Sequence, residues 1–200
     1  MTVPPLVLAS ASPRRTELLT RLGLAHTVDP AHVAEDHLAG ETPEEHVERL
    51  ARAKAAAVAL RHPDALVLAG DTVVVRDGAI LGKPATQEEA KSMLTSLSGR
   101  THTVVSGLAL AGPGAGEVHS RHDTARVRFR RLAAQEVAEY VATGEPMDKA
   151  GGYGIQGMGG ALVTGVEGDY YTVVGLPVSG LVALLAAAGW RYAFGGLRPF

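Results

Sequence analysis

An aspartate in the middle of an apolar β-type run constrains this chain more than any other feature. Residues 65–75 are typical of a buried strand apart from Gly70-Asp71-Thr72. Burying a carboxylate without a partner costs on the order of several kcal/mol, so a cation, a metal or a hydrogen-bond donor is expected close to Asp71. The alternative is a strand break at Gly70 that leaves Asp71 in a surface loop. The β-branched residues that follow argue against a simple loop.

Length and composition allow one domain, or two joined lobes, with a real hydrophobic core. The chain has 200 residues, 46% of them hydrophobic, and a formal net charge of −2, so no basic nucleic-acid-binding surface is expected. The absence of cysteine excludes disulfides, zinc–thiolate sites and cysteine nucleophiles. We expect a cytoplasmic protein with no membrane partner, because no signal-peptide pattern and no bilayer-spanning apolar run is found.

Helix-start signals and apolar runs outline the secondary structure. Helices are expected to begin at Ser12-Pro13, at Thr42-Pro43 and at Thr86-Gln87, the last two with capping boxes. The helices are expected at about 12–22, 42–60, 86–97, 132–143 and 176–188, and the strands at about 5–9, 65–75, 101–111, 117–130, 161–166 and 170–174. Strands and helices mix without strict alternation, which predicts an α/β or α+β fold with a mixed, largely antiparallel sheet.

Two arginines occupy the first turn of a predicted helix, where the helix dipole favours acidic side chains. Arg14 and Arg15 follow Ser10-Ala11-Ser12-Pro13, and the free N–H groups of a helix start attract anions. A guanidinium donates paired hydrogen bonds to phosphate oxygens. The pattern indicates an anion site; the alternative is a solvated helix start that happens to carry arginines.

Two lysines are placed unusually. Lys54 lies four residues after Leu50, on the apolar stripe of its predicted helix, so it either reaches to the edge of the core or points into a polar cleft. Lys83 follows a hairpin turn predicted at Asp77-Gly78, and the hairpin would fold it back beside the strand that bears Asp71. A lysine near an aspartate suits metal–phosphate chemistry; a surface salt bridge is the alternative.

A glycine-rich segment spans residues 151–160 and contains six glycines. Gly152, Gly154 and Gly157 match the G-x-G-x-x-G pattern, but no strand precedes it and a strand is expected after it, which argues against a dinucleotide site. The glycines would let the backbone approach a flat or anionic ligand. Gln156 can both donate and accept hydrogen bonds, as recognition of a base edge requires. The alternative is a purely structural loop.

Taken in order, these segments resemble the Maf family over about residues 6 to 185. The matching blocks are Leu8–Arg15, Gly70–Val74, Gly82–Pro84, Leu97–His102, Asp148–Gly157, Gly168–Tyr170 and Val174–Pro177. The resemblance implies one domain over residues 1–200 with an elongated two-lobed α/β fold, a mixed sheet with flanking helices and an active-site cleft between the lobes, similar to inosine triphosphate pyrophosphatases. It also implies hydrolysis of a nucleoside triphosphate to the monophosphate and pyrophosphate, a divalent cation (Mg²⁺ or Mn²⁺), and commonly a homodimer.

The resemblance further assigns roles to matching positions. Asp71 would accept the proton of the attacking water and help hold the metal, and Glu35 matches, more loosely, an acidic residue that also holds it. The phosphates would be bound by Ser12, Arg14, Arg15, Lys54 and Lys83. The specificity positions of the dTTP/UTP branch are matched by Arg15, Thr72 and Gln156, whereas a sister branch resembling 7-methyl-GTP pyrophosphatases differs around Thr72 and Gln156.

Three other functions are compatible with the same residues. One is a nucleotide-binding regulator of cell division whose hydrolysis is incidental. Another is a 7-methyl-GTP-type pyrophosphatase, and the third is a house-cleaning pyrophosphatase for modified nucleotides. The combination of one acid with several cations, typical of phosphoryl transfer, favours an enzyme.

Overall fold

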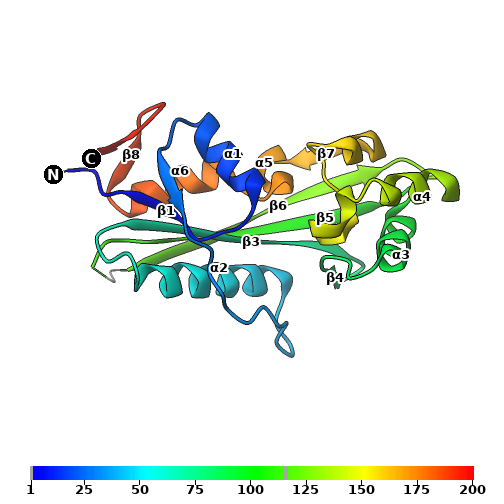
Figure 1. The fold of residues 1–200 in the computed structure, drawn as a ribbon, viewed down its shortest axis with the longest axis horizontal. Coiled ribbons are helices and arrows are strands. Elements are labelled where there is room, and N and C mark those ends of the chain that lie inside the picture. Colours follow the sequence, from blue (N-terminus) through cyan, green and yellow to red (C-terminus); the bar gives the residue numbers. More distant parts are fainter. Residues whose placement is uncertain (1, 115–116) are drawn as a thin grey trace. The chain divides into compact units, whose positions relative to one another are not determined.

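The computed structural model describes residues 2–114 and 117–200 (Figure 1), which form two compact units. Unit 1 comprises Met1–Asp71, Ser106–Asp123 and Gly175–Phe200, and unit 2 comprises Thr72–Val105 and Thr124–Val174. Three long strands contribute residues to both units: β3 (Leu66–Arg76), β5 (Thr101–Ala111) and β6 (Val118–Phe129). The expectation of a single domain stays a prediction.

Among the described residues, seven strands form one sheet in the order β2-β1-β3-β5-β6-β7, with β4 paired to β3 beside this path. Strand β1 (Leu6–Leu8) pairs in parallel with β2 (His26–Val28) and with β3. Strand β4 (Ala79–Leu81) pairs antiparallel with β3, and β7 (Val163–Gly168) pairs antiparallel with β6. The predicted α/β fold with a mixed sheet and flanking helices is confirmed.

Unit 1 has helices on both faces of its part of the sheet. Helix α2 (Pro43–Ala59) covers one face, and α1 (Pro13–Arg21) and α6 (Val178–Ala187) cover the other (Figure 1). Side chains alternate between the faces along a strand, so one set of small residues packs against α2: Val7, Ala9, Val67, Ala69, Ala109 and Ala111. The intervening leucines of the strands are fully buried as well.

Helix α2 approaches the sheet closely at Gly107 of β5. A Cβ atom added there would lie 2.5 Å from the carbonyl carbon and oxygen of Val47 and 2.9 Å from the backbone nitrogen of Glu48. These are main-chain atoms, which cannot rotate away. The absence of a side chain at residue 107 therefore sets how near α2 lies to the strands.

Unit 2 has its own core beneath α3 (Gln87–Leu97) and α4 (Ala134–Ala142), which pack against each other. The buried cluster contains Val74, Ala90, Leu94, Leu97, Val104, Val127, Phe129, Val137, Tyr140, Val141, Tyr153 and Leu162. Three short 3₁₀ helices follow α4: Glu145–Asp148, Ala150–Gly152 and Met158–Leu162. The second and third overlap the glycine-rich segment 151–160.

The predicted capping residues of α2 and α3 are found, with one difference in the second. Thr42 accepts a hydrogen bond from the backbone of Glu45, whose carboxylate accepts one from the backbone of Thr42, which completes the capping box of α2. Thr86 accepts from the backbone of Glu89 in the same way. The Glu89 carboxylate, however, accepts from the backbone of Ala85, so it caps the segment one residue earlier.

The strand expected at 170–174 is wrong: these residues form α5 (Tyr170–Val174). The Asp169 carboxylate accepts hydrogen bonds from the backbone N–H groups of Tyr171 and Thr172. An aspartate before a helix satisfies such N–H groups and favours helix initiation. This cap outweighs the β-propensity of the tyrosine, threonine and valine residues.

The C-terminal residues form a two-stranded hairpin of β8 (Trp190–Tyr192) and β9 (Leu197–Pro199). Strand β8 packs against α6, and the Tyr192 hydroxyl donates to the backbone oxygen of Leu22 at 2.8 Å. The hairpin is thus part of unit 1. No helix in the described part of the chain is both long and apolar enough to cross a membrane.

Candidate active site

Asp71 lies within the continuous strand β3, as the last residue of the first chain segment of unit 1. The five residues before it are buried, and the Asp71 side chain is itself only 13% exposed. The strand does not break at Gly70, so the surface-loop alternative is wrong. A nearly buried carboxylate in this position needs a compensating partner.

Lys54 provides that partner. It lies on α2 in line with buried Leu50, and its ammonium is 2.8 Å from the Asp71 carboxylate and 2.6 Å from the Glu35 carboxylate. The Lys54 side chain is 10% exposed, whereas that of Glu35 is 55% exposed. The lysine therefore points into a polar group of three charges, and the expectation of a cation beside Asp71 is confirmed.

Arg15 is a second buried cation of unit 1. Its Nε donates to the backbone oxygen of Gly175 at 2.8 Å, and its Nη1 donates to the Ser10 hydroxyl at 2.9 Å. Burial lowers the pKa of Arg15 from its ordinary value, and the negative charge of Asp71 opposes that shift. A Cβ atom at Gly70 would lie 3.3 Å from Arg15 Nε. The guanidinium thus packs against the strand directly before Asp71.

The N-terminus of α1 carries Ser12 and Arg14. Ser12 has the extended backbone of an N-cap residue, but its hydroxyl makes no capping hydrogen bond. No acidic residue occupies the first turn of α1, so the positive end of the helix dipole is not offset there. This geometry suits an anion, as the sequence pattern indicates.

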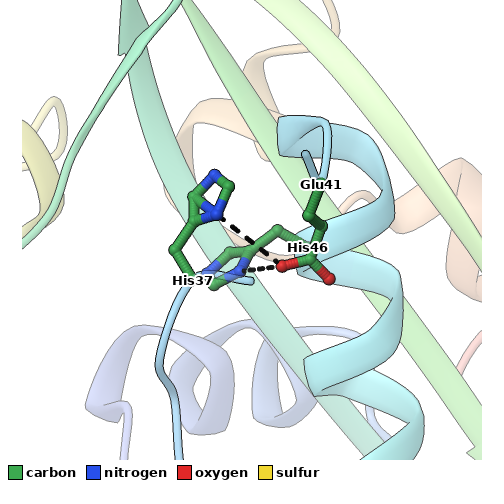
Figure 2. A group of neighbouring side chains, drawn as sticks. All are labelled: His37, Glu41 and His46. Atoms are coloured by element: carbon green, nitrogen blue, oxygen red, sulfur yellow. Dashed lines mark hydrogen bonds and ion pairs between the residues drawn. The ribbon is translucent and has the colours of Figure 1, made fainter. Parts of the chain in front are cut away.

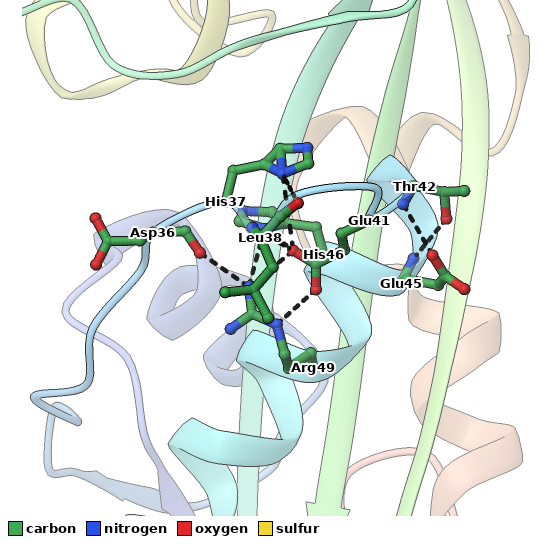
Figure 3. Close-up of polar contacts among 8 residues, drawn as sticks. All are labelled: Asp36, His37, Leu38, Glu41, Thr42, Glu45, His46 and Arg49. Atoms are coloured by element: carbon green, nitrogen blue, oxygen red, sulfur yellow. Dashed lines mark hydrogen bonds and ion pairs between the residues drawn. The ribbon is translucent and has the colours of Figure 1, made fainter.

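Glu41 and Arg49 anchor the segment that follows Glu35, and sequence reasoning missed them. The Glu41 carboxylate accepts from Arg49 Nε at 2.5 Å and from Arg49 Nη2 at 2.8 Å, and Arg49 Nη2 also donates to the backbone oxygen of Asp36 (Figure 3). Hydrogen bonds from Arg49 lower the pKa of Glu41 and outweigh the effect of burial. The clamp holds residues 36–41 against α2. Arg49, four residues after the Glu45 of the capping box, had no sequence signal for this partner.

A cluster of His37, Glu41 and His46 lies in the same place (Figure 2), with ligand atoms within 4.8 Å of one another. Two features argue against a metal ion there. Arg49 already neutralises Glu41 and lies 3.3 Å from His46 Nδ1. The two imidazole rings are stacked, with centroids 5.2 Å apart and planes 25° apart, so their in-plane lone pairs do not converge on one point. We interpret this cluster as part of the loop anchor.

A shallow groove of about 450 Å³ lies on unit 1. It is lined by Glu44, Glu45, Glu48, Arg49, Arg52 and His122. None of the residues predicted to bind substrate or metal lines it. Its three carboxylates make it a poor receptor for a polyphosphate.

Unit 2 holds the other predicted residues. The hairpin at Asp77-Gly78 is confirmed, because β4 pairs with β3 in a register that sets Leu81 opposite Val74. Lys83 follows β4 by two residues and is exposed. Thr72 begins this unit on β3, directly after Asp71 in the chain. Gln156 is exposed within the glycine-rich segment.

The sequence model of the Maf-like protein family matches residues 5–188. The chain belongs to the Maf family. Curated Maf relatives bear the name dTTP/UTP pyrophosphatase, three of which follow. That of Koribacter versatilis is 50% identical over 184 residues, covering 92% of this chain and 94% of its own length. Those of Moorella thermoacetica and Myxococcus xanthus are each 53% identical, covering 92% and 93% of this chain and 95% of their own lengths.

Two solved structures show a more distant similarity. A HAM1 protein from Coxiella burnetii is 20% identical, with a TM-score of 0.44 over 65% of this chain and 75% of that chain. A nucleoside-triphosphatase / dITP/XTP pyrophosphatase from Mycobacterium abscessus is 18% identical, with a TM-score of 0.39 over 64% of this chain and 75% of that chain. Similarity of this size carries no functional information.

Within the Maf chain described here, unit 1 brings together Arg15, Glu35, Lys54 and Asp71. Unit 2 holds Thr72, Lys83 and Gln156. Their roles in binding and catalysis stay predictions. The contact of Ser10 with Arg15 was not predicted. The position of Ser10 between an apolar run and a helix start is the sequence feature that could have indicated it.

Proposed function

We propose that this chain hydrolyses dTTP and UTP to the nucleoside monophosphate and pyrophosphate. The observation that carries the proposal is the Lys54 ammonium placed between the carboxylates of Asp71 and Glu35. Support comes from curated Maf relatives that are named dTTP/UTP pyrophosphatases and are 50% and 53% identical to the chain.

Asp71 orients the attacking water and accepts its proton, as a general base does in hydrolysis. Its position on a continuous strand fixes the carboxylate in space, and Lys54 Nζ at 2.8 Å offsets its charge. Without that cation, a carboxylate would repel a triphosphate. Phosphoryl transfer depends mainly on positioning and on charge compensation, and both are provided here by rigid secondary structure.

The phosphates are bound by cations from several segments. Ser12 and Arg14 act at the uncapped start of α1. Arg15 contributes from its buried position, and Lys83 contributes from the segment after β4. Lys54 shifts part of its interaction from the carboxylates to the phosphate oxygens when substrate binds.

A divalent cation, Mg²⁺ or Mn²⁺, belongs to this proposal. Asp71 and Glu35 would hold it once the Lys54 ammonium, which lies 2.8 and 2.6 Å from their oxygens, turns to the phosphates. Carboxylate oxygens suit such hard cations, and the chain has no cysteine that would favour a softer metal. When bound, the cation supplies charge stabilisation to the phosphate oxygens.

Base selection is assigned to Arg15, Thr72 and Gln156. The Gln156 amide carries both a donor and an acceptor, which matches the alternating groups on the Watson–Crick edge of a pyrimidine. A homodimer, a cytoplasmic location and the absence of a nucleic-acid partner are further predictions of family membership.

A pyrophosphate-release assay over a nucleotide panel tests the proposal. The panel contains dTTP, UTP, dCTP, GTP, 7-methyl-GTP and a modified pyrimidine triphosphate, each with Mg²⁺, with Mn²⁺ and with EDTA. We expect the highest kcat/KM for dTTP and UTP and no turnover in EDTA. A preference for 7-methyl-GTP, or binding without hydrolysis of any nucleotide, would contradict the proposal. Asp71→Asn protein purified in parallel measures contaminating phosphatase.

A further inference from the structure

Gln156 lies on a loop whose shape is set by contacts at its two ends. In this loop, Gly154–Gly159, the backbone nitrogen of Gly157 donates to the oxygen of Gly154 at 3.2 Å. The Gln156 side chain is exposed, and no residue in the described part of the chain forms a hydrogen bond with it. The direction of its amide therefore depends on the backbone of the loop.

The Glu145 carboxylate holds the C-terminal end of this loop. Its Oε2 accepts from the backbone nitrogen of Met158 at 2.9 Å, and its Oε1 accepts from that of Gly159 at 3.0 Å. Partial burial raises the pKa of Glu145. Hydrogen bonds from Gly159, Tyr140 and Met158 together lower it by more, so the net shift of the pKa is downward. The carboxylate accepts three donors at once.

Tyr140 connects Glu145 with the N-terminal end of the loop. Its hydroxyl donates to Glu145 Oε1 at 2.8 Å and accepts from the backbone nitrogen of Gly154 at 3.2 Å. The Tyr140 ring is buried in the core of unit 2. A two-residue network thus fixes both ends of the segment that carries Gln156.

The glycines of the loop make this contact possible. A Cβ atom at Gly157 would lie 2.5 Å from Glu145 Oε2, and one at Gly154 would lie 2.6 Å from Lys149 Cε. Lys149 Nζ in turn donates to the backbone oxygen of Glu145 at 2.7 Å. The loop therefore packs directly against the Glu145 carboxylate, while Lys149 holds the Glu145 backbone.

We propose that Glu145, together with Tyr140, is a positioning residue for base selection: it fixes the loop conformation from which the Gln156 amide contacts the base. This inference rests on the proposed function, because it assumes that Gln156 reads the base. A network that positions Gln156 affects the discrimination between nucleotides more than the binding of their common triphosphate.

Glu145→Gln is the first test. Glutamine keeps the shape of the side chain but presents an NH₂ group to a backbone N–H donor, so one of the three contacts becomes unfavourable. The ratio of kcat/KM for dTTP to that for dCTP is measured with Mg²⁺. We expect the ratio to fall by about tenfold, as the loss of one charged hydrogen bond implies. Glu139→Gln, at an exposed position of α4 whose carboxylate accepts a hydrogen bond from Gln135, should leave the ratio unchanged.

Tyr140→Phe is the second test and covers the case in which Glu145→Gln does not fold. It keeps the ring in the core and removes only the hydroxyl that contacts Glu145 and Gly154. We expect a fall in the ratio of several-fold with KM changing more than kcat. Equal losses for every nucleotide in both variants would show a purely structural role and would overturn the inference.

Gln156→Ala separates this inference from the proposed function. If Gln156→Ala lowers the dTTP/dCTP ratio while Glu145→Gln and Tyr140→Phe do not, the positioning role is wrong and the proposed function stands. If Gln156→Ala leaves the ratio unchanged, the inference fails with its premise. If the wild-type protein hydrolyses no nucleotide, the proposed function itself is wrong.

Discussion

The ammonium of Lys54 lies 2.8 Å from the carboxylate of Asp71, although one residue belongs to helix α2 and the other to strand β3. The same ammonium lies 2.6 Å from Glu35 in the segment between β2 and α2. Three separate elements of unit 1 thus meet at one nitrogen atom. The two carboxylates and the lysine carry a net charge of −1, which the nearby Arg15 guanidinium offsets.

Lys54→Met should destabilise the protein and weaken nucleotide binding. Methionine fills the same apolar stripe but leaves the carboxylates of Asp71 and Glu35 without their cation. Because Glu35 is half exposed, we expect a loss of about 1–3 kcal/mol in the free energy of unfolding, measured by urea denaturation. Mg²⁺ should restore more stability to the variant than it adds to the wild type.

The matched control is Lys91→Met, which removes an exposed lysine paired with Glu88 three residues away. It should change stability by less than about 0.5 kcal/mol. Equal stability losses for the two lysine variants would contradict the special role of Lys54.

Gly107→Ala should shift helix α2. The new methyl group would lie 2.5 Å from main-chain atoms of Val47, which cannot move without the helix. We expect a loss of about 2–3 kcal/mol in the free energy of unfolding and a lower kcat, because α2 carries Lys54. The control is Gly112→Ala, where nothing lies within 4 Å of the added atom, so its stability should be close to that of the wild type. Similar stability losses for the two variants would contradict the close approach of α2 to Gly107.

His102 makes the stability of unit 2 depend on pH. Burial lowers the pKa of His102 from 6.5 to about 4, while its Nε2 lies 2.8 Å from the Tyr153 hydroxyl. Between these values the unfolded chain binds the proton and the folded protein does not, so stability is full above pH 6.5 and falls as the pH decreases toward 4. The expected loss from this residue between about pH 7 and pH 5 is about 2 kcal/mol.

Urea denaturation at the two pH values measures this effect. His102→Gln should reduce the pH dependence, whatever it does to stability itself. Val104→Ala, a substitution in the buried cluster that contains Tyr153, the partner of His102, should lower stability equally at both pH values. If the stability of His102→Gln depended on pH as strongly as that of the wild type, groups other than His102 would account for the effect.

Local sequence patterns predicted most elements because their signals are local. The capping residues of α2 and α3 and the turn at Asp77-Gly78 act within a few residues, and each is found in the structure. Helix α1 begins where Ser12-Pro13 predicts, although the Ser12 hydroxyl makes no capping hydrogen bond. The strand predicted at 170–174 was wrong, because the capping carboxylate of Asp169 outweighs the β-propensity of the residues after it.

The site was only partly predictable from the sequence, because its contacts join segments that are distant in the chain. Helical periodicity predicted that Lys54 lies on the buried side of its helix, and the apolar run around Asp71 predicted a partner for its carboxylate. Neither pattern alone predicted that the two residues form an ion pair. Nothing in the local sequence links Glu145 to Met158 or Arg49 to Glu41, because these bonds depend on how loops pack after the elements have formed.

Asp71→Asn tests the central claim most directly, with Asp77→Asn as its control on an exposed, ion-paired aspartate. Asparagine keeps the shape of the side chain but cannot accept the proton of water. We predict that kcat for dTTP falls by about 10²–10⁴-fold while the calorimetric Kd changes by less than about tenfold, and that Asp77→Asn behaves as the wild type. Near-normal turnover by Asp71→Asn would contradict the account.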